Sequence, residues 1–474
     1  MREHPDLEKL PLEIVGIPVR ETIREIFRDP KNGMPDNISK AGCVALALRS
    51  NEVGEPARGY VVWNAWREHF PGKKTQINAV DFSEADLRSF RINFSRFIFG
   101  NAAKFTSVNF GHVVSFFGAR FGYGADFRDA KFGDHANFNA VQWGAGVDFS
   151  AAQFGRYANF IAVQWFGMIA FRGTRWGLGA RFLGAHGRGR ANFFSATFDG
   201  GDGEGDDEGD AVDFTGLKWA SLFKYLDHDQ SLLDAGQKFS ENIGREPNEF
   251  GDIDFSGAKF HGGVSFQDRC FVSKTQFANV AFGKAPFFHG CELHQDFSFE
   301  GVVFPPPTGK EDAVRAYRTL KLAFSKQQAV REVQRFFRLE MEEETLRETG
   351  LKRLLFQAYK TFSDYGFSII RPLKYGGLGV LVLTALYGLL SWLGQCGLSV
   401  QACHFAPQWL EFSLLQTLPL PGLDKLSEAA SKAFWPQGAW WNFGLSALVI
   451  LHKTLSLAAL FLIGLALRNL FKLK

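Results

Sequence analysis

The stretch GADFRDAKFGDHANF, residues 124–138, contains phenylalanine at positions 127, 132 and 138, with gaps of five and then six residues. An amphipathic helix repeats about every 3.6 residues and a half-buried strand every two, so neither period explains these gaps. An alternation of five and six instead predicts short straight segments joined by corners. Each segment would turn one large side chain inward.

Two interleaved aromatic series run through this part of the chain in steps of eleven residues. The first is phenylalanine at every step from 94 to 193, and the second, from 99 to 198, is aromatic at every step except Gly187. Both series resume between 255 and 304, where Leu293 is the non-aromatic member. A repeat of this kind determines the fold before any single residue does.

A small or slim residue stands two positions before most of these aromatics, and positions two apart on an extended segment face the same side. We therefore expect rings to stack on rings and small residues on small residues in successive coils. Polar residues between them, such as Asp126, Asn137 and Asp148, should face outward or turn the corner. Glycines that follow the second series predict a wider corner at every second segment, needing φ > 0 or close backbone approach. These are Gly100, Gly111, Gly122, Gly133, Gly144, Gly155 and Gly177.

The triplets ADF at 125–127, ANF at 136–138 and ADL at 85–87 make the chain similar to the pentapeptide-repeat proteins, whose unit is A(D/N)LXX or its phenylalanine version. The resemblance implies a mainly β solenoid, a right-handed quadrilateral β-helix. We assign it to residues 81–304, with an acidic and helical insertion at about 199–250. Residues 1–80 are expected to form an N-terminal helical cap over the apolar core.

From residue 311 the apolar spacing becomes helical, which predicts a helical neck over residues 311–370. Its last part, LKRLLFQAYKTF at 351–362, has leucines and aromatics on one side and Lys352, Arg353 and Lys360 on the other. A basic amphipathic helix directly before an apolar run is expected to lie in a membrane interface.

Residues 375–474 are predicted to form a two-helix transmembrane domain, with spans at 376–394 and 445–467. Lysine and arginine gather before the first span and after the second, so the positive-inside rule places both termini in the cytoplasm of a multi-pass protein of the bacterial inner membrane. The expected membrane-interface cations are Lys352, Arg353, Lys360, Arg371, Lys374, Arg468 and Lys472.

The region between the spans contains WLEFSLLQTLPLPG at 409–422, an apolar, helix-like segment that ends at two prolines. Either residues 395–440 lie wholly outside the membrane, or this segment is re-entrant and pore-like, as in two-span ion channels and in some membrane-bound pentapeptide-repeat proteins. Irregular backbone at membrane depth must line a cavity or be buried in protein. The sequence QTLPLPG does not resemble a potassium filter, so no ion selectivity is predicted; Gln416 and Thr417 are the candidate constriction residues.

His452 and Lys453 lie inside the second apolar run. Either they face a lumen or a partner helix as pore or gating residues, or the span begins near Thr454 and Lys453 reaches outward. Cys396 and Cys403 could form a disulfide if the loop is periplasmic, and otherwise they are apolar fillers. Their spacing is not that of a metal site.

The sequence carries no motif of a catalytic nucleophile, a phosphate loop, a dinucleotide fold or a metalloprotease, so no enzyme, catalytic residue, cofactor or metal is predicted. The histidines of the repeat are expected to be solvated on its surface. These are His112, His135, His186, His261 and His289.

Three functions follow from this organisation. The first is a homo-oligomeric pore or channel-like membrane protein, with a tetramer favoured, whose solenoid is a sensor, a vestibule or a platform for an unknown protein or ligand. The alternative is a membrane-anchored scaffold with a non-conducting anchor in the lipid bilayer. The third is mimicry of DNA towards a topoisomerase, but residues 81–198 carry 13 Lys and Arg against 7 Asp and Glu, the wrong sign for a duplex mimic.

Overall fold

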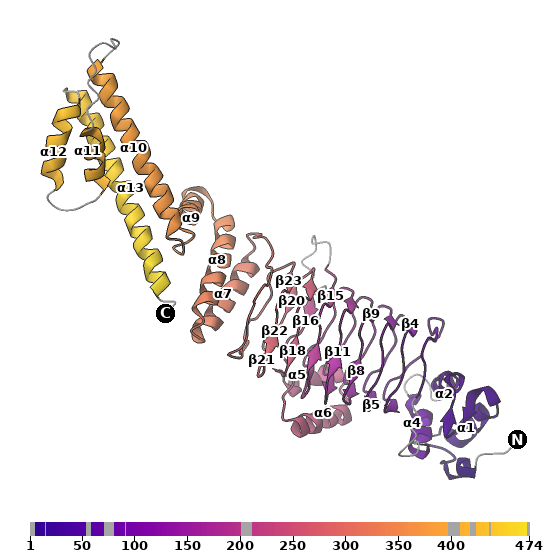
Figure 1. Ribbon diagram of the computed structural model, residues 1–474. Helices are drawn as coiled ribbons and strands as arrows, with labels where there is room; N and C mark the ends of the chain where they lie inside the picture. The colour runs from indigo at the N-terminus through magenta and orange to yellow at the C-terminus, as the bar shows by residue number, and fades with distance from the viewer. Residues whose placement is uncertain are drawn as a thin grey trace. The chain divides into compact units, whose positions relative to one another are not determined.

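The computed structural model describes residues 5–14, 16–53, 58–70, 80–90, 92–200, 211–396, 408–417, 423–435 and 438–471. The chain divides into two compact units, Met1–Pro306 and Pro307–Lys474. In the first, helices precede a long series of short parallel strands, whereas the second is helical (Figure 1).

The strands of the first unit stack side by side in three main sheets (Figure 1), and we refer to β3 to β23 together as the strand stack. One sheet consists of β3 (Ile98–Gly100), β5 (Arg120–Phe121), β7 (Gln142–Trp143), β10 (Gln164–Trp165) and β13 (His186–Gly187). A second consists of β8 (Val147–Asp148), β11 (Ile169–Ala170), β14 (Ala191–Asn192), β18 (Ile253–Asp254) and β22 (Thr275–Gln276). The third consists of β4 (Asn109–Gly111), β6 (Lys131–Phe132), β9 (Gln153–Phe154), β12 (Arg175–Trp176), β15 (Thr197–Phe198), β19 (Lys259–Phe260) and β23 (Ala281–Phe282). Two smaller pairs join β16 (Val212–Asp213) to β20 (Val264–Ser265) and β17 (Glu249–Phe250) to β21 (Cys270–Phe271).

Uninterrupted pairings between neighbouring strands advance by one constant step along the chain. Gln142 pairs with Gln164, which lies 22 positions later, and Lys131 pairs with Gln153 in the same parallel register. A fourth row of single bridges follows the same step, from Ser115 through Asn137 to Asn159. Four rows of pairing residues therefore alternate along the chain at intervals of six and five.

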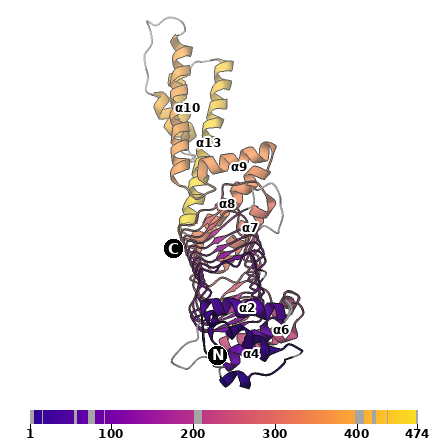
Figure 2. The ribbon, with the colours of Figure 1, turned by 90° about the vertical axis from the view of Figure 1, so that its right-hand side faces the viewer.

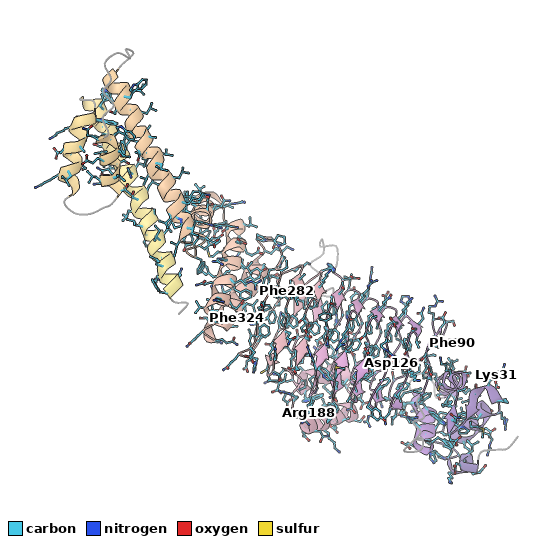
Figure 3. All side chains as sticks on the ribbon, in the orientation of Figure 1. Lys31, Phe90, Asp126, Arg188, Phe282 and Phe324 are labelled. Carbon is cyan, nitrogen blue, oxygen red and sulfur yellow. The ribbon has the colours of Figure 1, made fainter. Side chains whose placement is uncertain are left out.

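The aromatic rings form the core of the strand stack. The ring of Phe127 lies 4.7 Å from that of Phe105 and 4.6 Å from that of Phe149, with planes inclined by 4° and 11°. These spacings match the separation of neighbouring strands, so each ring lies directly over the one before it. Side chains fill the space between the sheets along the stack (Figure 3), and each fully buried phenylalanine stabilises the fold by about 1.5–3 kcal/mol.

The polar residues of the repeat turn its corners, as the sequence predicts. The carboxylates of Asp126 and Asp148 and the amide oxygen of Asn137 each accept a hydrogen bond from the backbone N–H two residues later. The residue three positions later has positive φ, for example 60° at Ala151. The side-chain acceptor stabilises a backbone conformation that non-glycine residues seldom adopt.

The glycines after the second aromatic series are explained mainly by close approach. A Cβ at Gly133 would lie 2.5 Å from the carbonyl oxygen of Gly111, and one at Gly144 would lie 2.4 Å from the backbone of Gly122. In this series only Gly100 and Gly111 have positive φ, 72° in both. The wide corners of successive layers touch, which leaves no room for a side chain.

At Gly187, the one non-aromatic position of the second series between 99 and 198, a side chain of the preceding layer fills the space. A Cβ at this position would lie 2.4 Å from the indole of Trp165, whose Nε1 donates to the carbonyl of Gly189, 2.9 Å away. Trp165 therefore occupies the space that an aromatic at 187 would need.

The chain leaves the strand stack twice between Phe198 and Glu249. Residues 201–210 lie outside the described residues, and β16 then returns to the stack before α5 (Trp219–Leu222) and α6 (Gln230–Ile243) pack beside it (Figure 1). After these departures the register is restored, because the ring of Phe193 stacks at 5.1 Å on that of Phe255.

Arg269 supplies hydrogen-bond donors to the layer that the segment containing α5 and α6 interrupts. In the neighbouring layer the carbonyl of Val163 accepts the backbone N–H of His186, whereas the equivalent carbonyl of Ala185 accepts Nη1 of Arg269 at 3.0 Å. The fully buried guanidinium also donates to three further backbone carbonyls and lies 3.9 Å from the centre of the Phe250 ring. Those carbonyls belong to Phe182, Phe214 and Pro247.

The N-terminal helices cover the first layers of the strand stack. They are α1 (Val19–Phe27), α2 (Lys40–Val53) and α4 (Tyr60–His69), with a short hairpin of β1 (Gly33–Met34) and β2 (Asn37–Ile38) between the first two. The indole of Trp63 stacks on Phe97 at 5.1 Å and donates to the carbonyl of Ile98 at 3.0 Å. The open end of the aromatic core is thus shielded from water.

The second unit begins with an antiparallel pair of helices, α7 (Glu311–Lys326) and α8 (Val330–Arg347). The rings of Phe324 and Phe336 stack between them. The buried carboxylate of Glu340 in α8 accepts hydrogen bonds from Arg318 and Lys321 in α7. In the described residues five helices follow. They are α9 (Gly350–Ser363), α10 (Ile370–Cys396), α11 (Gln408–Thr417), α12 (Leu423–Phe434) and α13 (Ala439–Phe471). Both long helices exceed the spans expected from the sequence, and α12 is a helix that the sequence analysis does not anticipate.

Candidate functional site

Two helices of the second unit are long and apolar enough to cross a membrane. These stretches are Ile370–Leu393 in α10, with a mean hydropathy of 1.8 in its most apolar part, and Trp440–Asn469 in α13, with 2.1. Many of their large apolar side chains are exposed, including Leu381 at 67% and Phe461 at 69%. Such exposure is unlike the core helix of a water-soluble protein and suits contact with lipid.

The short helix α11 packs against both long helices, and polar side chains join them. The hydroxyls of Thr384 in α10 and Ser413 in α11 lie 2.6 Å apart. The hydroxyl of Thr417 lies 3.2 Å from Nε2 of His452 in α13. Side-chain hydrogen bonds therefore link α11 to both α10 and α13.

The bond between Thr417 and His452 indicates the tautomer of the imidazole. The Thr417 hydroxyl donates to the carbonyl of Ser413 at 3.0 Å, so its lone pair accepts from an N–H at Nε2 of His452. In this tautomer Nδ1 is an acceptor. Among the described residues, this buried nitrogen has no hydrogen-bond partner.

Other buried polar atoms of the described region share this lack of a hydrogen-bond partner: Oε1 of Gln416, the hydroxyl of Tyr387 and the hydroxyl of Ser456. Gln416 is 2% exposed and His452 is 0% exposed, and the ring of Tyr387 stacks on that of His452 at 6.0 Å. Buried polar groups without partners are uncommon and mark places where water or a ligand is held or where a structure changes. We define the membrane polar cluster as Thr384, Tyr387, Ser413, Gln416, Thr417, His452 and Ser456.

The structure thus brings together three of the four pore candidates, Gln416, Thr417 and His452, inside one chain. His452 lies well inside α13, which begins at Ala439, so it is roughly 20 Å from the start of that helix. Lys453, the fourth candidate, follows on the same helix and is partly exposed. The pore-lining role of these residues remains a prediction.

Sequence analysis did not select Thr384, Tyr387, Ser413 or Ser456. Serine and threonine in an apolar helix commonly bond to their own backbone, as Thr384 does with the carbonyl of Val380, so their presence alone indicates little. The available signal was spacing, because Ser456 follows His452 by one helical turn and shares its face.

The predicted membrane-interface cations lie on α9 and at the ends of the long helices. Lys360 pairs with Glu342 at 2.7 Å, and Arg371 pairs with Asp364 at 3.3 Å. Arg353 and Lys374 are exposed. Lys472 lies outside the described residues, as do Cys403 and the side chain of Cys396, the predicted disulfide, and residues 418–422 of the pore-like segment.

One histidine of the repeat differs from its prediction. His186 is fully buried, because α6 covers its sheet, and its ring nitrogens bond to the carbonyl of Gly184 and the hydroxyl of Ser240. Burial lowers the pKa of His186 to about 4, so the ring is neutral at physiological pH. The expectation that it is solvated is wrong.

Among the described residues, no three His, Cys, Asp or Glu side chains are placed to hold a metal ion together. No family model, curated protein or solved structure matches this chain.

Proposed function

We propose that this chain forms a homo-oligomeric membrane pore or channel-like protein, and that its strand stack is a right-handed, four-sided solenoid of pentapeptide repeats. The solenoid assignment is supported by the four rows of pairings, their constant step of 22 positions and the alternating intervals of five and six. A coil with four sides and one aromatic per side requires this spacing. The solenoid would act as a sensor, a vestibule or a platform for a partner.

The observation that carries the pore proposal is the hydrogen bond between Thr417 of α11 and His452 of α13. A helix of 10 residues is about 15 Å long, half the thickness of a bilayer core, so α11 cannot span. It is nevertheless held between two helices that can. A short helix with polar contacts between two spans is the plan of a two-span pore, whereas a simple anchor needs only the spans.

Two spans per chain cannot enclose a pore, so the proposal requires several copies, and we favour a tetramer. The distribution of lysine and arginine supports a bacterial inner-membrane protein with both termini, and therefore the solenoid, in the cytoplasm. A role in making the membrane permeable suits this organisation.

The second candidate is a membrane-anchored scaffold, and the burial of the membrane polar cluster favours it. Gln416 and His452 are almost completely buried within a single chain. Polar side chains in such positions often serve only to hold transmembrane helices together.

Conductance of the full-length protein in a planar bilayer separates the two candidates. The test variant is Thr417→Val, which keeps the shape but loses the bond to His452. Thr454→Val is the matched control, because this exposed threonine of α13 bonds to the carbonyl of Ile450 in its own helix. Discrete current steps that change in Thr417→Val but not in Thr454→Val support the pore. Silence of the folded, inserted wild-type oligomer across voltages and pH values favours the scaffold.

A further inference from the structure

The helix α9 carries a coherent apolar face that the described parts of the second unit leave open. Leu351 is 71% exposed, Leu354 60%, Leu355 59% and Phe362 45%. In an α-helix Leu351, Leu355 and Phe362 lie almost in line, with Leu354 beside them. Tyr359, one turn after Leu355, borders this face and packs on the unit, with its ring 5.7 Å from that of Tyr365.

This apolar face continues into the first candidate span. Ile370 and Leu373, at the start of α10, are 76% and 56% exposed. The two helices are joined by a turn at residues 364–367, and α9 lies crosswise to α10 and α13 (Figure 2). A helix with this orientation suits the plane of a bilayer surface when α10 and α13 cross it.

The charges of α9 are all positive and lie on the side of the helix away from the apolar face. Its sequence contains Lys352, Arg353 and Lys360 and no acidic residue. Arg353 is exposed, and Lys374 extends the exposed positive charge to the first turns of α10. Cations on one side of α9 and exposed leucines on the other match a layer of phosphate groups above a layer of acyl chains.

We propose that α9 docks in the surface of the bilayer and that Arg353 and Lys374 bind the phosphate headgroups of anionic phospholipids. The proposal rests on the membrane location of α10 and α13 but not on conduction. Docking of α9 would also connect the membrane surface to the neck, because the ion pair of Lys360 with Glu342 joins α9 to α8.

The test measures how deeply a fluorescent label on α9 lies in nanodiscs that contain brominated lipid. The full-length chain carries an introduced cysteine in a background whose accessible native cysteines are serine. Leu355→Cys probes the apolar face, and Gln357→Cys, also exposed but on the other side of α9, is the matched control. Leu381→Cys, in the middle of α10, reports insertion of the span.

We expect brominated lipid to quench the label at 355 at least twofold more than the label at 357. In nanodiscs with anionic lipid the difference should grow, and Arg353→Gln with Lys374→Gln should remove that growth. Quenching at 381 without preferential quenching at 355 would overturn the docking of α9. Equal quenching at 355 with and without anionic lipid would overturn the headgroup assignment, and absent quenching at 381 would instead contradict the membrane location itself.

Discussion

The imidazole Nε2 of His186 and the hydroxyl of Ser240 lie 2.7 Å apart, both in buried side chains, although the two residues are 54 positions apart. This contact docks α6 on the sheet that contains β13. Nδ1–H donates to the carbonyl of Gly184, so in the neutral ring Nε2 accepts from the Ser240 hydroxyl, and burial away from water keeps the ring neutral.

Acid should therefore loosen the docking of α6. The pKa of His186 is 6.5 in the unfolded chain and about 4 in the fold, because burial disfavours the charged ring. The stabilisation is complete above pH 6.5 and is lost as pH falls from 6.5 towards 4, by about 3 kcal/mol in total. Protection factors of the α6 amides, which correct hydrogen exchange for its intrinsic dependence on pH, should fall as the pH is lowered from 7 to 4. His186→Gln should abolish the extra pH dependence, whereas His261→Gln, an exposed histidine, should leave it unchanged; the same profile in His186→Gln would contradict the assignment.

Replacing Arg269 should destabilise the strand stack strongly. Arg269→Met removes a donor from four backbone carbonyls, of which that of Phe182 still accepts the N–H of Ala185, at a cost of about 3–5 kcal/mol. The check is urea unfolding of the detergent-solubilised protein, followed by circular dichroism. Arg175→Met, at an exposed position of β12, is the control and should change stability by less than about 0.5 kcal/mol. Similar midpoints for both variants would show that Arg269 is not needed.

Gly187→Ala should be harmful although alanine is small. Its Cβ would meet the indole of Trp165 at 2.4 Å, and moving a tryptophan that is bonded to Gly189 should cost about 1–3 kcal/mol. Gly263→Ala is the matched control, since a Cβ there meets its nearest neighbour at an ordinary 3.5 Å. Thermal unfolding of both variants measures the difference. An unchanged melting temperature for Gly187→Ala would mean that the Trp165 side chain can rearrange without loss of stability.

Asp364→Asn should weaken the junction between the neck and the first span. The carboxylate of Asp364 lies 3.2 Å from Arg338 of α8 and 3.3 Å from Arg371 of α10, and asparagine keeps its size while removing the charge. Because the carboxylate is 25% exposed, we expect a loss of only about 1 kcal/mol. Faster hydrogen exchange at residues 363–371 is the expected signature. Glu348→Gln, which breaks the pair with Lys352, should leave this segment unaffected.

The aromatic repeat was predictable from the sequence because its members are local and periodic, and the described structure shows these rings in stacked parallel strands. The hydrogen bonds of Arg269 were not predictable, since its acceptors lie between 22 and 87 positions away and belong to the backbone. His186 was misjudged for a similar reason. Its burial depends on α6, which returns to its sheet only after the chain has left the strand stack, and nothing near His186 signals that cover.

In the candidate site the sequence indicated residues but not their arrangement. Thr417 and His452 stood out because they interrupt apolar runs, yet their hydrogen bond depends on how α11 is seated. Thr384 and Ser413 escaped notice because small hydroxyl side chains are ordinary in apolar helices. The helix α12 was missed because its surroundings were interpreted as an irregular loop.

The register that survives the two departures has a consequence for how such a chain can change in length. Phe193 stacks on Phe255 nearly as closely as Phe171 does on Phe193, although both departures separate the first pair and neither separates the second. Duplication or loss of the segment that makes one complete layer would lengthen or shorten the stack by one strand spacing, about 4.8 Å, while every ring kept a neighbour above and below. Insertion or loss of whole layers therefore preserves the ring stacking. Insertion or loss of a shorter segment would shift the later strands onto different sheets.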